Sequence, residues 1–254
     1  MLDFYVLVDS YRDVHGIGLK QLGSFLAPPS VHYCEATGPD GERLRSKYSI
    51  VSLSAFRRRA RGAALESMFW ARFAQPTLLI CEDPALREDL LVTLAYATRH
   101  FLRETAPLLQ GEIETTEVWE RGLKESYKTE LRPEDADGRS KQIVSNNRDR
   151  YVQLAEAMFA SGNSESTLKI GNAGKLRRNL CRLRWFARRF VGKPMGVFRV
   201  LKAFFTFDAG LDYVLEKIKS HNGVEITVSD HARKYPLLHA PALAWRIFRK
   251  GGFR

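Results

Sequence analysis

Two aspartates near the start of the chain have the residue type and the setting for metal or phosphate chemistry. Asp3 and Asp9 accompany an apolar run that predicts a β-strand over residues 2–9. Side chains alternate across a strand, so the two carboxylates would share one face, one near each end. Leu7 belongs to that face and is apolar. We therefore expect this strand to be buried on both sides.

A carboxylate on a buried strand is costly unless a cation or hydrogen-bond donors compensate for it. Mg²⁺ prefers carboxylate oxygen, so the pattern predicts a Mg²⁺ site at Asp3 and Asp9. The sequence leaves an alternative open, in which Asp3 caps a local segment and Asp9 lies in the turn after the strand.

A second chemical feature is a concentrated positive charge. The chain has 40 Lys and Arg residues against 29 Asp and Glu, and eleven of the 40 lie between Ser166 and Phe207, where no acidic residue occurs. The rest of the chain is therefore neutral. A basic block of this kind is typical of proteins with a polyanionic partner, either nucleic acid or an anionic membrane.

Length and composition limit the classes of protein. The 254 residues, 44% of them hydrophobic, are enough for one large domain or two small ones. No apolar run approaches the roughly 18 residues of a membrane span, and the start lacks the pattern of a signal peptide. Cys34, Cys81 and Cys181 form no metal-ligand spacing, so we expect no disulfide or structural zinc and a reducing compartment.

Several short elements must position these residues. The patterning predicts further strands over 31–36, 47–53 and 77–81. It predicts helices over 56–73, from Asp83 and Pro84 as N-cap and first residue to Phe101, over 113–125 and over 151–159. Residues 132–140 are expected to form an exposed loop and 161–164 a linker. A helix over 209–221 and a strand over 224–228 would follow the basic block.

Carboxylates on a strand among short strands, followed by a helical second half, suggest a nucleotidyltransferase of the polymerase-beta type. The segment Met1-Leu-Asp-Phe4 followed by Val8-Asp9 closely resembles the M-L-D-F-x-x-x-V-D-D strand of the mitochondrial-type phosphatidate cytidylyltransferases, the translocator assembly and maintenance family. Further similar segments follow in order: His32-Tyr33, Met68–Pro76, Gly122-Leu123, Ser126–Arg132, Ile143-Val144 and Tyr151. The resemblance covers about residues 1–160.

The resemblance implies that the chain makes CDP-diacylglycerol and pyrophosphate from CTP and phosphatidate, with Mg²⁺, in phosphatidylglycerol and cardiolipin biosynthesis. It implies catalytic and metal-binding roles for Asp3 and Asp9. Candidates for phosphate contacts are Lys47, Arg72, Lys128 and Arg132. Arg132 matches an arginine of the family, and its guanidinium fork suits a phosphate. For each of these, a solvated surface charge is the alternative.

The sequence departs from the family pattern in several respects, including Gln75 for a lysine, Thr129 for a glycine and Glu130 for an aspartate. The family has a Gly-Ser element upstream of the aspartate strand, and this sequence begins on the strand itself, so we expect a start internal to a longer protein or a truncated gene. Ser10 replaces the second aspartate of V-D-D. A truncated, inactive relative that binds anionic membrane or nucleic acid, and a nucleotidyltransferase acting on RNA, therefore stay open as alternatives.

Aromatic and leucine residues alternate with the cations of the basic block, which is typical of a helix lying in a membrane interface. The expected membrane-binding residues are Arg177, Arg178, Arg182, Arg184, Trp185, Arg188 and Arg189. Membrane is favoured over RNA because apolar insertion adds nothing to phosphate-backbone binding. The expected location is peripheral, on the cytoplasmic face of a bacterial inner membrane or the matrix face of the mitochondrial inner membrane.

The predicted fold class is α+β, with three parts. A polymerase-beta-like nucleotidyltransferase domain, incomplete at its N-terminus, would occupy residues 1–83. A helical, winged-helix-like domain would occupy 84–165. A basic, amphipathic, membrane-associating region would occupy 166–254.

Overall fold

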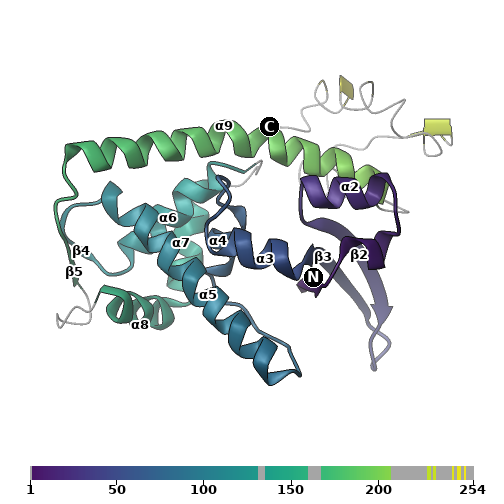
Figure 1. Cartoon of the computed structure of the whole chain (residues 1–254), viewed down its shortest axis with the longest axis horizontal. Coiled ribbons are helices and arrows are strands. Elements are labelled where there is room, and N and C mark those ends of the chain that lie inside the picture. The colour runs from purple at the N-terminus through teal and green to yellow at the C-terminus, as the bar shows by residue number, and fades with distance from the viewer. Residues whose placement is uncertain are drawn as a thin grey trace. The chain divides into compact units, whose positions relative to one another are not determined.

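The computed structural model describes residues 2–130, 135–159 and 167–206, with isolated positions at 228, 229, 231, 232, 242, 245, 246 and 249. The chain divides into two compact units (Figure 1). Unit 1 comprises residues 1–53 and 197–254, and unit 2 comprises residues 54–196. These boundaries fall at other positions than the predicted ranges 1–83, 84–165 and 166–254.

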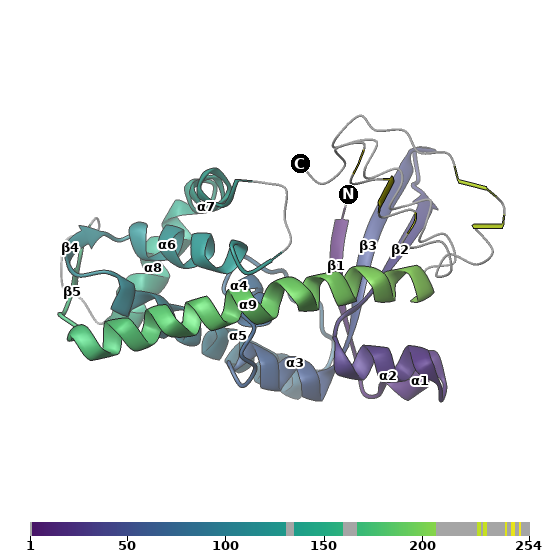
Figure 2. The ribbon, with the colours of Figure 1, turned by 90° about the horizontal axis from the view of Figure 1, so that it is seen from above.

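Unit 1 contains a three-stranded sheet with the order β1-β3-β2 (Figure 2). Its strands are β1 (Leu2–Val8), β2 (Ser30–Thr37) and β3 (Arg43–Ser52). The pair of β1 and β3 is parallel, whereas β2 and β3 are antiparallel. Three of the strands predicted from sequence are thus present. Parallel pairing requires a crossover, and α1 (Tyr11–His15), α2 (Leu19–Leu26) and β2 lie between β1 and β3 in the chain.

The expectation that β1 is buried on both faces is wrong. Leu2, Phe4 and Val6 are 57%, 41% and 41% exposed. Among the described residues β1 pairs only with β3, so it lies at an edge of the sheet. An edge strand has fewer neighbours to cover its side chains, which is why apolar residues alone did not predict burial.

Unit 2 is mainly helical, with one short two-stranded sheet. Its elements in chain order are α3 (Leu53–Ala60), which begins at the last residue of unit 1, α4 (Met68–Phe73), α5 (Pro84–Thr105), η1 (Ala106–Leu108), β4 (Gly111–Glu114), α6 (Glu117–Tyr127), α7 (Ala136–Ser145), α8 (Arg148–Phe159), β5 (Thr167–Ile170) and α9 (Lys175–Thr206), which continues past Gly196 into unit 1. β4 and β5 pair antiparallel.

Large aromatic side chains form the core of unit 2. Trp70 of α4 contacts Phe101 of α5 and Trp185 of α9, with ring centroids 6.2 and 5.7 Å apart. Trp119 of α6 stacks on Phe101 at 5.4 Å and lies 4.9 Å from the ring of Tyr151 of α8. These contacts join α4, α5, α6, α8 and α9. Large rings bury more apolar area than other side chains, which suits them to a core shared by several helices.

Some element predictions hold and others fail. Asp83 caps α5 through its carboxylate, with Pro84 as the first residue, as predicted. The predicted helix over 56–73 is wrong, since α3 ends at Ala60 and α4 begins at Met68. Residues 77–81 form no strand. The helix predicted over 113–125 is instead strand β4 followed by α6.

The predicted loop over 132–140 is partly wrong, because Asp135 caps α7 through its carboxylate. The helix predicted over 151–159 is present as α8. The predicted linker over 161–164, helix over 209–221 and strand over 224–228 lie outside the described residues. The fold is therefore mixed α+β. No helix in the described part of the chain combines the length and the apolarity that crossing a membrane requires.

Candidate functional site

Asp3 lies on one face of the unit 1 sheet, beside a lysine. The register of β1 and β3 places Asp3 opposite Lys47, and the lysine Nζ is 3.8 Å from the Asp3 Oδ2. Both side chains remain about one-third exposed. On β2, Tyr33 is the partner of Lys47, so three polar side chains cross this face in one row. The arrangement could position an anion beside Lys47, with Asp3 holding the ammonium group.

Asp9 lies at the other end of β1. The strand is extended over Leu2–Val8, and a rise of about 3.3 Å per residue separates the Cα atoms of Asp3 and Val8 by about 17 Å. Magnesium binds its ligands at about 2.0–2.1 Å, so one ion does not reach both carboxylates. The described residues also contain no group of three or more His, Cys, Asp or Glu side chains suited to a metal. The residues present do not fit the predicted Mg²⁺ site.

His32 and Tyr33, the pair that resembles a family motif, lie on opposite faces of β2. The His32 ring stacks on Tyr48 at 5.1 Å and on His15 at 5.9 Å. The Tyr33 hydroxyl donates to Glu35 Oε1 at 2.5 Å. That hydrogen bond, with the nearby Arg43, lowers the pKa of Glu35.

The other predicted phosphate contacts belong to unit 2 or lie outside the described residues. Arg72 is partly buried in the last turn of α4. Lys128 follows the end of α6, with its Nζ 3.5 Å from Glu125 Oε1. Arg132 lies outside the described residues. Among the described residues of unit 1, the structure places Asp3 and Lys47 of the predicted catalytic and phosphate-binding set side by side.

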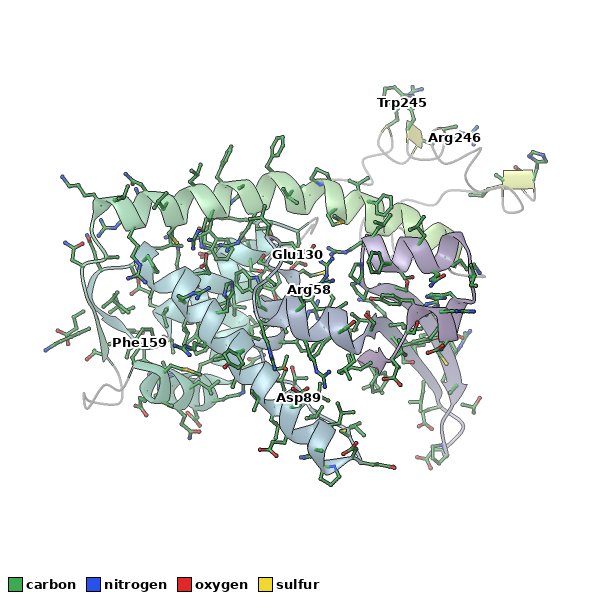
Figure 3. The ribbon with its side chains drawn as sticks, viewed as in Figure 1. Arg58, Asp89, Glu130, Phe159, Trp245 and Arg246 are labelled. Carbon is green, nitrogen blue, oxygen red and sulfur yellow. The ribbon has the colours of Figure 1, made fainter. Side chains whose placement is uncertain are left out.

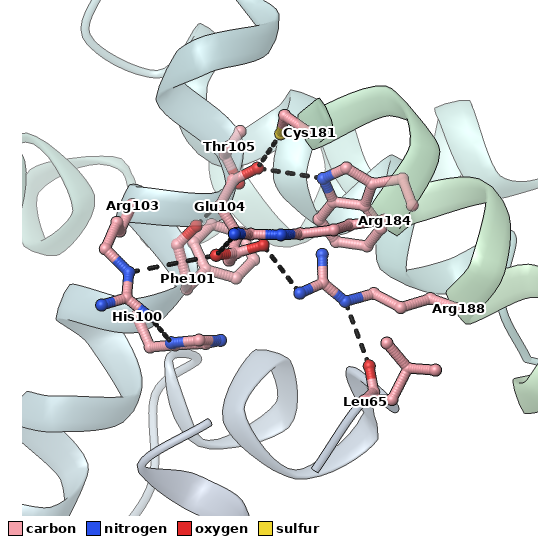
Figure 4. A network of polar contacts seen from close by, with 10 residues as sticks. Leu65, His100, Phe101, Arg103, Glu104, Thr105, Cys181, Arg184 and Arg188 are labelled. Carbon is pink, nitrogen blue, oxygen red and sulfur yellow. Dashed lines mark hydrogen bonds and ion pairs between the residues drawn. The ribbon is translucent and has the colours of Figure 1, made fainter. Parts of the chain in front are cut away.

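The inner face of α9 packs against the C-terminal turn of α5, around the carboxylate of Glu104 (Figure 4). Arg188 Nη2 donates to Glu104 Oε2 at 2.7 Å, and Arg184 Nη1 donates to Oε1 at 2.9 Å. The main-chain oxygen of Glu104 accepts from Trp185 Nε1 at 2.9 Å and from Cys181 Sγ at 3.1 Å. One residue of α5 thus binds four side chains of α9.

These contacts correct the expected membrane-binding set. Trp185 and Arg188 are buried, and the Arg188 guanidinium lies 4.8 Å from the Trp185 ring centroid and 5.2 Å from that of Trp70. Arg189 forms an ion pair with Glu125 of α6. The structure therefore places Trp185 and Arg188 in the core, and Arg184 and Arg189 in ion pairs within unit 2.

Electrostatics favour the ionised form of Glu104. Burial acts to raise the pKa of this carboxyl group, but the hydrogen bond and charge of Arg188, with the charge of Arg184, outweigh it and lower the pKa below 4.5. Burial raises the pKa of the Cys181 thiol, with the charge of Glu104 acting in the same direction. The Cys181 thiol therefore stays protonated and donates its hydrogen bond.

The opposite side of α9 is apolar and exposed. At 100° per residue, five side chains fall on the side opposite Trp185, and we call them the outward face: Leu176, Leu180, Leu183, Phe186 and Phe190. Their exposed fractions run from 49% at Leu180 to 77% at Phe190. Arg177 and Arg184 lie along one edge of this face and Arg182 along the other. Arg178 projects toward the side of Trp185 and donates hydrogen bonds to Gln110 and Asn172 of unit 2. Side chains stand along both sides of the helix (Figure 3).

Sequence reasoning missed Glu104 and the division of α9 into a buried side and an exposed side. A signal for Glu104 was present, because it follows Ala97 and Phe101 of α5 at the helical spacing of four and three residues, and both are buried. Likewise Cys181, Trp185 and Arg188 recur at that spacing on α9. Placing the basic block on a helical wheel would have separated its buried side from its exposed side.

Comparison with known proteins adds no family to this description. No protein-family model matches the chain, and no curated protein matches it.

Proposed function

We propose that the chain is a peripheral membrane protein that binds anionic lipid surfaces through the outward face of α9. The observation that carries the proposal is an exposed apolar face with arginines along both edges, in a segment without acidic residues. Exposed leucine and phenylalanine would enter the acyl boundary, while the long arginine side chains extend to the lipid phosphates.

The magnitudes support binding. Each cation near an anionic leaflet contributes about 1 kcal/mol, and full burial of a leucine or phenylalanine side chain contributes about 1.5–3 kcal/mol. Arg177 and Arg182 form no ion pair among the described residues, so their charges are not offset within unit 2. Together with five apolar side chains, they suffice for reversible attachment.

A membrane is favoured over RNA by the position of the apolar residues. Leu176, Leu183 and Phe190 occupy the middle of the outward face, and the cations stand at its edges. A nucleic-acid surface needs cations at its centre, where the phosphates lie. The proposed location is the cytoplasmic face of a bacterial inner membrane or the matrix face of the mitochondrial inner membrane.

Flotation with liposomes tests the proposal. We expect the purified chain to float with vesicles containing phosphatidate, and binding to weaken at about 1 M salt, where the screening length falls to about 3 Å. Leu183→Ser combined with Phe190→Ser should abolish flotation. The matched control is Leu78→Ser with Ile80→Ser, which removes two apolar side chains that are 85% and 78% exposed in the segment before α5. Equal loss in both variants, or salt-independent binding to neutral vesicles, would refute the proposal.

A second candidate is catalytic, and we propose phosphatidate cytidylyltransferase activity on CTP at that membrane. The observation that favours it is Asp3 on β1 beside Lys47 of the parallel strand β3, together with the ordered sequence resemblance. On this proposal Lys47 contacts a phosphate group of CTP, and Asp3 orients the Lys47 ammonium group. An active enzyme would bring membrane lipid and nucleotide to one protein.

The assay for the second candidate uses CTP, Mg²⁺ and phosphatidate liposomes, with CDP-diacylglycerol as the measured product. We expect the unaltered chain to form product. Asp3→Asn or Lys47→Gln should lower the rate of product formation at least tenfold, because each removes about one charge-assisted contact. Glu42→Gln, an exposed carboxylate of the same unit, serves as the control. If the unaltered chain forms no product but still floats with vesicles, the proposal of catalytic activity is refuted and the proposal of membrane binding stands.

A further inference from the structure

A pocket opens between the C-terminal turn of α5 and the first turns of α9, within unit 2. Its volume is about 300 Å³, and its lining includes Arg103, Arg177, Leu180 and Arg184, with Glu104, Pro107 and Cys181 completing the wall. Ligand pockets for drug-sized molecules run from about 300 to 1,000 Å³, so this one suits a small group. We call it the α5–α9 pocket.

The pocket carries an excess of positive charge. Three guanidinium groups line it, against the single carboxylate of Glu104. That carboxylate is already engaged by Arg188, which is buried and does not line the pocket, at 2.7 Å. Arg184 and Arg103 also approach that carboxylate, at 2.9 and 3.9 Å. Arg103, Arg177, Arg184 and Arg188 therefore supply four formal positive charges against the one negative charge of Glu104, and an excess of three remains for a ligand.

The three arginines differ in how tightly they are held. Arg184 donates to Glu104 Oε1 at 2.9 Å, and Arg103 contacts His100 Nδ1 at 2.9 Å. Arg177 forms no ion pair or side-chain hydrogen bond with the described residues. A guanidinium fork presents paired donors to phosphate oxygens. The guanidinium groups of Arg103 and Arg184 are held in place, and that of Arg177 can adjust. Together they suit a group with several charged oxygens.

The pocket also borders the outward face of α9. Leu180 lines the pocket and is 49% exposed, and Leu176, one turn earlier, is 75% exposed. A ligand with a phosphate head and an apolar body could therefore contact the arginines and the leucines at once.

We propose that the α5–α9 pocket binds a phosphomonoester group, carried either by a membrane lipid or by a soluble compound. The lipid form rests on the proposed membrane binding, whereas the soluble form does not. A phosphomonoester offers three terminal oxygens and up to two charges, which matches three arginines better than a phosphodiester with two such oxygens and one charge.

The test compares vesicles of phosphatidate with vesicles of phosphatidylglycerol at matched surface potential. The unaltered chain should bind the phosphatidate vesicles about tenfold more tightly, since each hydrogen bond to a charged group contributes on that scale. Arg103→Gln with Arg177→Gln should reduce this ratio to about one. Arg182→Gln, on the other edge of α9 and outside the pocket, should weaken binding to both vesicles and keep the ratio.

A soluble arm identifies the source of the phosphate. Glycerol 3-phosphate should raise the thermal midpoint of the unaltered chain and of Arg182→Gln, but not of the double variant, if soluble phosphomonoesters bind. If the chain prefers phosphatidate vesicles but glycerol 3-phosphate does not raise its thermal midpoint, the phosphomonoester that the pocket binds belongs to a lipid. A shift without any vesicle binding would support the pocket and refute the membrane proposal. Vesicle binding with neither selectivity nor shift would overturn the pocket and leave the membrane proposal standing.

Discussion

At the C-terminal turn of α5, the buried carboxylate of Glu104 accepts hydrogen bonds from Arg184 and Arg188 of α9. Arg188 is also buried and lies over the rings of Trp70 and Trp185. Removing one partner of a buried ion pair leaves an uncompensated charge, whereas removing both can be nearly neutral. The stability that Glu104 and Arg188 give to the docking of α9 therefore depends on both side chains being present.

This pairing predicts a strong dependence of each mutation on the other. Glu104→Leu alone should lower the free energy of unfolding by about 3–5 kcal/mol, because Arg188 would stay buried without its anion. Glu104→Leu combined with Arg188→Met should recover most of that loss. Urea unfolding at pH 7 measures all four members of the cycle. Additive effects of the two substitutions would contradict a buried, mutually dependent pair.

His100 makes stability depend on pH in a separate window. Burial lowers the pKa of its imidazole from 6.5 to about 4, against the opposing charge of Glu104 and with the help of Arg103. As pH falls below 6.5, the unfolded chain binds a proton that the folded chain refuses until about pH 4. The free energy of unfolding should therefore fall with pH across this window, by up to about 3 kcal/mol.

The variant His100→Gln isolates this effect. It should be less stable than the unaltered chain at pH 7, because the ring packs edge-on against Trp70 with centroids 5.0 Å apart. Its stability should change less between pH 7 and pH 5, since no imidazole remains to be protonated. Urea midpoints at several pH values give both slopes, and equal slopes would show that His100 is not the titrating group.

At the scale of elements, α9 approaches the end of α6 closely enough to require glycine. A Cβ atom on Gly192 would lie 2.5 Å from the main-chain oxygen of Thr129. Alanine normally stabilises a helix by about 1 kcal/mol relative to glycine. Here the backbone of Thr129 would have to move, so the close contact outweighs helix propensity.

We therefore expect Gly192→Ala to lower the free energy of unfolding by about 1–3 kcal/mol. Asn179→Ala, at an exposed position of the same helix, is the control and should be neutral or slightly stabilising. Chemical denaturation of the two variants compares them directly. A stabilised Gly192→Ala would mean that α9 does not approach Thr129 this closely.

The elements that sequence predicted well are those whose signals are local. Asp83 and Pro84 start α5 through a capping hydrogen bond and a fixed backbone angle, both within a few residues. The helix over 56–73 failed because Gly62 adopts a φ of 88° after α3, against the ring of His100. The apolar run at 77–81 has strand propensity but no partner strand in the part of the chain that the structure describes, and propensity alone does not form a sheet.

The site was less predictable, because its contacts join distant parts of the chain. The sequence showed that the basic block was a candidate binding helix, but its buried side depends on Glu104, 84 residues before Arg188. The prediction that Asp3 and Asp9 form one site rests on the alternation of side chains along a strand. Alternation predicts that two side chains share a face, but it does not give the distance between them. Two carboxylates on one face of a strand can therefore lie too far apart to bind one ion.

At the scale of the whole molecule, the formal net charge of +11 derives from one segment, most of which is α9. That helix has three kinds of surface: a buried side that packs in unit 2, two basic edges, and the apolar outward face. Exposed apolar side chains along a helix edged by arginine match the boundary between lipid headgroups and acyl chains.

Insertion of the outward face into lipid is the central claim, and a fluorophore on that face tests it most directly. The environment-sensitive dye NBD would be attached to Leu183→Cys in a chain that also carries Cys34→Ser and Cys81→Ser, leaving the buried Cys181 in place. Leu78→Cys in the same background is the control. We predict that phosphatidate vesicles shift the emission at position 183 to the blue and raise its intensity, with little change at position 78. Unchanged emission at position 183 on vesicles that carry the protein would contradict the account.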